Sequence, residues 1–105
     1  MKAGRELDAK VAGELFGWKK DHWDWEFSLP HYSTSIAAAM LVVEKLIEMG
    51  YYVDIGVDEH GAQVQLDRFD PSREIFWETG GSIRADTAPE AICLAALKAK
   101  ENENE

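Results

Sequence analysis

The sequence predicts an α+β fold in which helices and a small antiparallel sheet form a layered sandwich. Apolar residues three or four positions apart, early and late in the chain, predict helices. Strict alternation of apolar and polar residues over 51–67 predicts two strands with one buried face. The expected order is helix, helix, an antiparallel sheet of three or four strands, and helix.

The first helix is predicted over residues 4–16. Leu7, Val11 and Leu15 recur four positions apart, which places them on one face. Gly17 is a typical helix-ending residue, and we expect Trp18 to fold back on the helix. From Trp18 to Pro30, aromatic and charged residues alternate without a helical period, so we expect an ordered loop there, with room for a short extended piece at 24–27.

A second helix is expected after Ser33 or Thr34, whose hydroxyl would accept its free N–H groups, and Gly50 should end it. Apolar residues at helical spacing predict its core-facing stripe, which consists of Ile36, Met40, Val43 and Ile47. The charged residues Glu44, Lys45 and Glu48 should face water. Leu41 and Val42 widen the apolar arc, and we expect the first helix to cover them.

The strands follow. Residues 51–57 and 62–67 alternate in phase around the turn 58–61, which predicts an antiparallel hairpin. The sequence Asp-Pro-Ser at 70–72 interrupts it. We expect a third strand over 74–79, a bend at Gly80-Gly81, and either a fourth short strand or an extended lead over 82–85.

The last helix begins with a capping box. Thr87 should accept the backbone N–H of Glu90 while the Glu90 side chain reaches back, and the helix should run to about Ala99. A stripe of mostly small residues would let it lie close to a neighbour: Ile92, Ala95, Ala96 and Ala99. We expect one domain over residues 1–100 and a disordered acidic tail over 101–105.

Two segments carry a resemblance to a known family. Residues 31–50 and 85–99 each join a helix cap to an alanine-rich run, and Arg5-Glu-Leu-Asp8 and Gly17-Trp18 precede them. Together they resemble the phage ABA sandwich domain, a small α/β family of phages and prophages. The likeness covers most of the chain. It implies a layered fold and carries no established activity.

The chain is acidic. Its 105 residues carry a formal charge of −9, which disfavours general nucleic-acid binding because that affinity comes chiefly from Lys and Arg. The order of elements is similar to that of double-stranded RNA binding domains, but Asp86 and Glu90 stand where those domains need cations. The acidity either keeps the protein dissolved or meets a basic partner. One cysteine, no apolar leader and no membrane-length apolar run predict a cytoplasmic protein of the bacterial host, without membrane association.

The segment that joins the first two helices is the predicted binding surface. Tryptophan and tyrosine are enriched at binding surfaces, and hydroxyls at a helix N-terminus can hold an anion. The alternative is that these rings only cover the core and that the hydroxyls only cap the helix. The candidate binding residues are Trp18, His22, Trp23, Trp25, His31, Tyr32, Ser33 and Thr34.

Catalytic chemistry and cofactors are not expected. His22 and His31 lie near Asp21, Asp24 and Glu26 without the short spacings of metal sites. Cys93 has no activating neighbour in sequence and should be structural.

The predicted function is that of a non-catalytic phage or prophage accessory protein that binds a protein partner, for example as a counter-defence or host-takeover inhibitor. A small-ligand or nucleotide-binding module is the alternative, using the N-terminus of the second helix and the strand arginines. A metal-dependent enzyme is the third reading. The sequence leaves the oligomeric state open.

Overall fold

A computed structural model describes residues 2–19, 28–70 and 75–103. The elements are α1 (Arg5–Phe16), α3 (Ile36–Glu48), β1 (Tyr51–Asp58), β2 (Gly61–Asp70), β3 (Ile75–Ala85) and α4 (Ala88–Glu103). The strands form one antiparallel sheet in the order β1-β2-β3. The α+β class and the element order are therefore confirmed.

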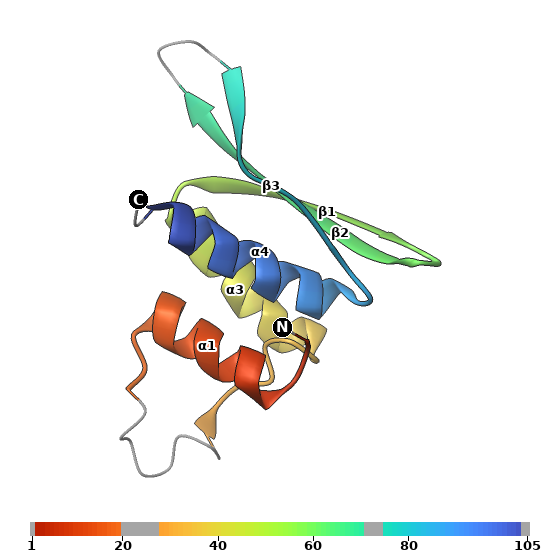
Figure 1. Ribbon diagram of the computed structural model, residues 1–105. Coiled ribbons are helices and arrows are strands. Elements are labelled where there is room, and N and C mark those ends of the chain that lie inside the picture. Colours follow the sequence, from red (N-terminus) through yellow and green to blue (C-terminus); the bar gives the residue numbers. More distant parts are fainter. Residues whose placement is uncertain (1, 20–27, 71–74, 104–105) are drawn as a thin grey trace.

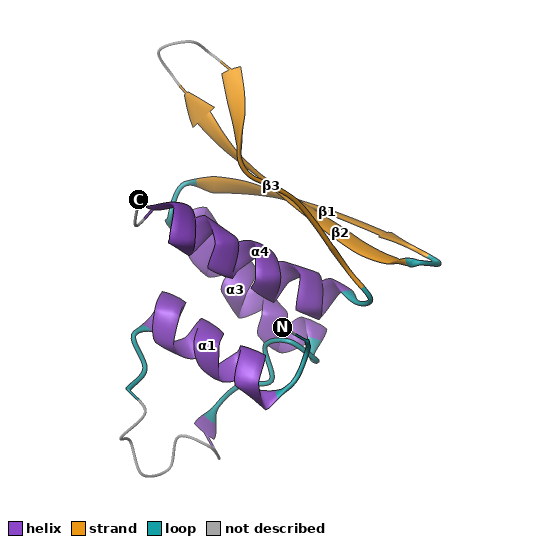
Figure 2. Ribbon diagram, viewed as in Figure 1, coloured by secondary structure: helices purple, strands orange, loops and turns teal. Residues whose placement is uncertain are grey.

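The elements form layers (Figures 1 and 2). Helices α3 and α4 lie side by side on one face of the sheet, α3 against β1 and α4 against β2 and β3. Helix α1 packs on α4, on the side away from the sheet. The far ends of β2 and β3 project beyond the helices.

The third strand is longer than expected. Residues 75–85 form a single strand, so the predicted interruption at Gly80-Gly81 does not divide it. Gln65 pairs with Ser82 and Asp67 pairs with Glu78, so that residues 79–81 stand opposite Leu66 alone. Glycines suit such a bulge, which bends a strand without ending it.

The end of α1 and the start of α4 agree with the prediction from the sequence. Gly17 ends α1 with φ 72°, and the Trp18 backbone N–H donates to the Ala12 carbonyl at 3.1 Å, which confirms the fold-back. Thr87 Oγ1 accepts the Glu90 N–H at 3.4 Å, as predicted. The Glu90 carboxylate does not complete the box, because it accepts the Ala3 N–H instead, at 2.7 Å. Helix α4 continues to Glu103, beyond its expected end near Ala99.

The prediction for the second helix was wrong in two respects. Its cap is Ser35, whose side chain accepts the Ala38 N–H, and not Ser33 or Thr34. Its buried face also differs, because only Val43 of the predicted stripe is buried. Ile36, Met40 and Ile47 are exposed, and the buried residues are Ala39, Val42, Val43 and Leu46. We expected helix α1 to cover the wider apolar arc at Leu41 and Val42. It packs on α4 instead, and Leu41 stays exposed.

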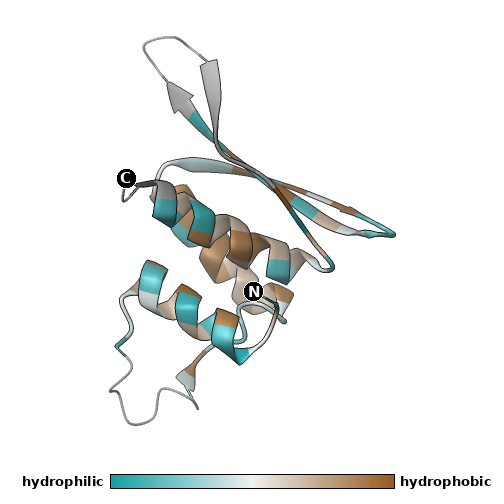
Figure 3. Cartoon of the chain, in the orientation of Figure 1, coloured by the Kyte–Doolittle hydropathy of each residue, from teal (hydrophilic) through white to brown (hydrophobic). Residues whose placement is uncertain are grey.

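The core lies between the sheet and the helices and continues to α1. Val64 and Leu66 of β2 are fully buried, whereas Val53 and Ile55 of β1 are half-buried. The predicted small-residue stripe of α4 is confirmed: Ile92, Ala95, Ala96 and Ala99 are all buried. Figure 3 shows apolar residues concentrated on α3 and α4, while the tip of the β1–β2 hairpin is hydrophilic.

Candidate functional site

The structure separates the residues of the predicted binding segment. His22, Trp23 and Trp25 lie outside the described residues. Trp18 is half-buried against the core. Tyr32 is buried and stacks on Phe16, with the ring centroids 5.3 Å apart and the planes 8° from parallel.

Of the other three residues, Ser33 and His31 contact a polar cluster, and the Thr34 backbone N–H donates to the His31 carbonyl at 3.2 Å. Ser33 is fully buried, whereas His31 and Thr34 are exposed. The centre of the cluster is Asp8, a fully buried carboxylate on α1. Its Oδ1 accepts the Ser33 backbone N–H at 2.7 Å and the Ser33 hydroxyl at 2.6 Å. Its Oδ2 pairs with Arg5 at 2.9 Å.

The cluster joins four parts of the chain. Arg5 also donates to the Leu29 carbonyl at 2.8 Å, and one of its nitrogens lies 3.1 Å from His31 Nδ1. The Gly4 N–H donates to Ser33 Oγ at 2.8 Å. Through Glu90 and Ala3, the N-terminal segment is tied to α4 as well.

These contacts explain the cluster as a structural connection. Both oxygens of Asp8 have donors within the protein, which is what a buried carboxylate needs. Ser33 is therefore engaged with Asp8 and is not presented to a ligand. The sequence carried one signal that our reading missed: Asp8 stands among Leu7, Val11 and Leu15 on the apolar face of the first helix.

Cys93 is a poor nucleophile in this environment. Burial, followed by the charges of Asp8 and Glu90, raises the pKa of its thiol to about 12. The reactive form of cysteine is the thiolate, which therefore does not form near neutral pH. Burial, with smaller contributions from Cys93 and Asp8, also raises the pKa of Tyr32. Among the described residues, no three His, Cys, Asp or Glu side chains are grouped to hold a metal ion.

The outer face of α3, which we define as Ile36, Met40, Leu41 and Ile47, is the main exposed apolar surface on a described helix. These side chains retain 54%, 44%, 46% and 57% of their accessible surface. Glu44 and Glu48 are exposed on the same helix, and Lys45 lies 3.8 Å from Glu48. The helix therefore buries one apolar side in its own core and presents another to solvent.

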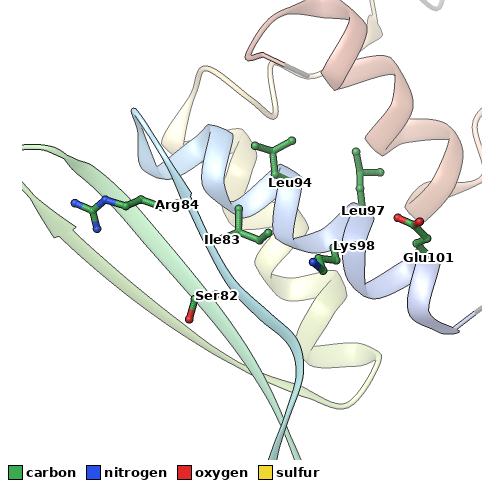
Figure 4. A pocket seen from close by; sticks show the side chains of 7 residues that line it. All are labelled: Ser82, Ile83, Arg84, Leu94, Leu97, Lys98 and Glu101. Carbon is green, nitrogen blue, oxygen red and sulfur yellow. The ribbon is translucent and has the colours of Figure 1, made fainter.

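A second feature is an open groove of about 610 Å³ between β3 and α4 (Figure 4). Strand β3 contributes Ser82, Ile83 and Arg84 to its lining. Helix α4 contributes Leu94, Leu97, Lys98 and Glu101. The three apolar side chains are half-buried, so the groove combines an apolar floor with a charged rim.

The strand arginines in the described residues make structural contacts. Arg84 donates to both carboxylate oxygens of Asp58 at 2.8 Å. That bond, followed by the His60 backbone N–H, holds the pKa of Asp58 below its usual value. Arg68 lies over the Tyr51 ring, 4.5 Å from its centroid, and donates to the Met49 carbonyl at 3.2 Å. These two guanidinium groups do not converge on a shared pocket.

Comparison with known proteins identifies a family. The family model for the phage ABA sandwich domain matches residues 9–97. No curated protein and no solved structure matches the chain. Within the parts of the chain that the structure describes, no helix is both long and apolar enough to span a membrane.

Proposed function

The chain belongs to the phage ABA sandwich domain family, and from that membership we propose that it is a non-catalytic phage or prophage accessory protein that binds another protein. The observation that carries the proposal is the outer face of α3. Four large apolar side chains on one helix are each about half exposed. Three of them, Ile36, Met40 and Ile47, lie along one side of the helix, and exposed apolar surface of this kind is characteristic of interaction sites.

Helix geometry supports the same reading. Ile36, Met40 and Ile47 recur at the spacing of four and seven residues that aligns them along one side of a helix. Such a row can enter an apolar groove of a partner as a set of anchors. Glu44 and Glu48 border the row, so the complementary surface is apolar at its centre and carries Lys or Arg at its edge.

The charge of the whole chain agrees with a basic partner. At −9 over 105 residues, the protein would be steered toward a positively charged surface. A host protein that binds nucleic acid presents such a surface. Our specific proposal is that the protein covers it as a counter-defence or host-takeover inhibitor in the bacterial cytoplasm.

The ligand-binding alternative has weaker support. It relied on hydroxyls at the N-terminus of α3 and on the strand arginines. Ser33 is engaged with Asp8 and Ser35 caps the helix, while Arg84 is held by Asp58. Ser33, Ser35 and Arg84, three of the groups that would hold an anion, are thus already bonded within the protein.

The test begins with isolation of the partner. The tagged protein is expressed in the phage's host and cross-linked, and the captured protein is then purified separately. Its affinity is measured by calorimetric titration for the wild type, for Ile47→Glu and for Val57→Glu. Val57 is a matched control, because it is an exposed aliphatic residue on β1 and not on α3.

We expect Ile47→Glu to weaken binding at least about tenfold, because an unpaired carboxylate would be buried in the interface. Val57→Glu should leave the affinity within about twofold. Circular dichroism checks that both variants fold. Equal affinities for all three proteins would overturn the proposal.

A further inference from the structure

The outer edge of β3 is an open edge of the sheet. The order β1-β2-β3 puts β3 at the end, and no other strand in the described residues pairs with it. At 11 residues it is also a long edge strand. An edge of this kind offers a row of backbone N–H and C=O groups to any extended chain that can reach it.

The register shows which residues of β3 offer these groups. Asp58 and Gly61 pair across the two-residue turn and so form the closing hydrogen-bonded pair of the hairpin. Because bonding directions alternate along a strand, Gln63 and Gln65 bond toward β1 and Val64 bonds toward β3. Ile83, the partner of Val64, therefore directs its backbone hydrogen bonds to β2.

Ser82 and Arg84, the partners of Gln65 and Gln63, alternate with Ile83. Their backbone N–H and C=O groups consequently point to the open side. Both residues also line the groove between β3 and α4. The free bonding edge and the apolar floor thus occupy the same place.

The apolar floor of the groove can receive side chains of a peptide strand that pairs with the open edge of β3. Successive side chains of a strand point to opposite faces, so every second one would face α4. On that side the groove presents Ile83, Leu94 and Leu97, as Figure 4 shows. A volume of about 610 Å³ accommodates two or three aliphatic side chains.

The rim offers one cation to an occupant, at its α4 side. The groove is lined by the exposed Lys98, by Glu101 and by Arg84, whose guanidinium is already paired with both carboxylate oxygens of Asp58. Lys98 is therefore the rim cation that an acidic side chain of an occupant can meet. A peptide carboxylate would meet Lys98 at the α4 side.

We propose that the groove binds an extended peptide segment by strand addition to β3. The segment carries aliphatic side chains at alternate positions and an acidic residue beside them. Backbone bonds to Ser82 and Arg84 supply the pairing, and the floor of the groove selects the side chains. This site is separate from the outer face of α3 and stands without it.

The experiment uses a random heptapeptide display library as the probe, selected on the full-length protein. Enriched peptides are synthesised, and their affinities are measured by fluorescence polarisation. Ser82→Pro removes the outward N–H, and proline is tolerated where a strand N–H faces away from the sheet. Ser82→Ala is the matched control, because it removes only the hydroxyl, which lies 3.4 Å from Gln65.

A second pair tests the rim. Lys98→Glu reverses a charge at the groove, and Lys10→Glu reverses an exposed charge on α1. Neither substitution touches the sheet, so this pair decides the outcome if Ser82→Pro fails to fold.

The expected result is enrichment of alternating aliphatic peptides with an acid. Their affinity should fall at least tenfold in Ser82→Pro and severalfold in Lys98→Glu, and stay within twofold in the two controls. No enrichment would overturn the proposal. So would peptides that bind the folded Ser82→Pro and Lys98→Glu proteins as tightly as the wild type.

Discussion

Asp8 is the residue on which the N-terminal part of the fold depends most. It is fully buried and accepts three hydrogen bonds, two of them from Ser33. Arg5, its ion-pair partner, is 42% exposed, so water screens that part of the interaction. The bonds to buried Ser33 therefore matter more to stability than the ion pair does.

Removing this carboxylate should destabilise the protein strongly. Asp8→Ala leaves the buried Ser33 N–H and hydroxyl without their acceptor, and we expect a loss of about 2–4 kcal/mol in the free energy of unfolding. Ser33→Ala keeps the backbone bond and should cost about 1–2 kcal/mol. Urea denaturation measures both. As a control, Glu14→Ala on the exposed side of α1 should stay within about 0.5 kcal/mol of the wild type. An Asp8→Ala protein as stable as that control would contradict the account.

The buried thiol of Cys93 predicts a dependence of stability on pH. Folding raises its pKa from 9.0 to about 12, so between these values the unfolded chain loses a proton that the folded protein keeps. Stability is therefore unaffected below pH 9 and falls as the pH rises above it, by up to about 1.4 kcal/mol per pH unit.

Cys93→Ala removes this dependence and is the comparison that isolates it. Urea unfolding of both proteins at pH 8, 9, 10 and 10.5 should show the wild type losing stability faster than the variant above pH 9. If the unfolding free energies of the two proteins change in parallel with pH throughout this range, folding does not raise the pKa of the Cys93 thiol.

At the scale of elements, α3 shows why a helix could be predicted while its orientation could not. Its apolar residues extend around most of its circumference, and two different stripes have helical spacing. Periodicity therefore located the helix without deciding between the stripe that contains Ile36 and Ile47 and the one that contains Ala39 and Leu46. The choice is made by packing against α4 and β1, contacts that are remote in sequence.

The β1–β2 hairpin depends on one glycine. Gly61 has φ +140°, and a Cβ there would clash with the Ala85 carbonyl oxygen. We expect Gly61→Ala to cost about 1–3 kcal/mol because the backbone must shift away from β3. The matched control is Gly56→Ala, since a Cβ at Gly56 meets nothing within 4 Å. That change should be neutral or stabilise the protein by less than about 1 kcal/mol. Equal unfolding free energies for the two variants would refute this close approach.

For the whole molecule, the fold class, the order of helices and strands and the pairing of the strands could be predicted from the sequence. Alternation over β1 and β2 gave the hairpin, and glycine and capping residues gave most helix ends. What it did not give depends on contacts distant in sequence. The Asp8–Ser33 bond joins residues 25 positions apart, and Glu90 reaches across 87 positions to Ala3. The groove likewise arises only when α4 returns to lie beside β3.

The central claim is that the outer face of α3 is open in the free protein and covered in the complex. The direct measurement is the rate at which a maleimide labels Ile47→Cys, alone and with saturating partner. Cys93 adds little background because it is buried and its pKa is about 12. We expect rapid labelling of the free protein, since Ile47 is 57% exposed, and at least tenfold slower labelling in the complex. The same rate with and without saturating partner would contradict the claim.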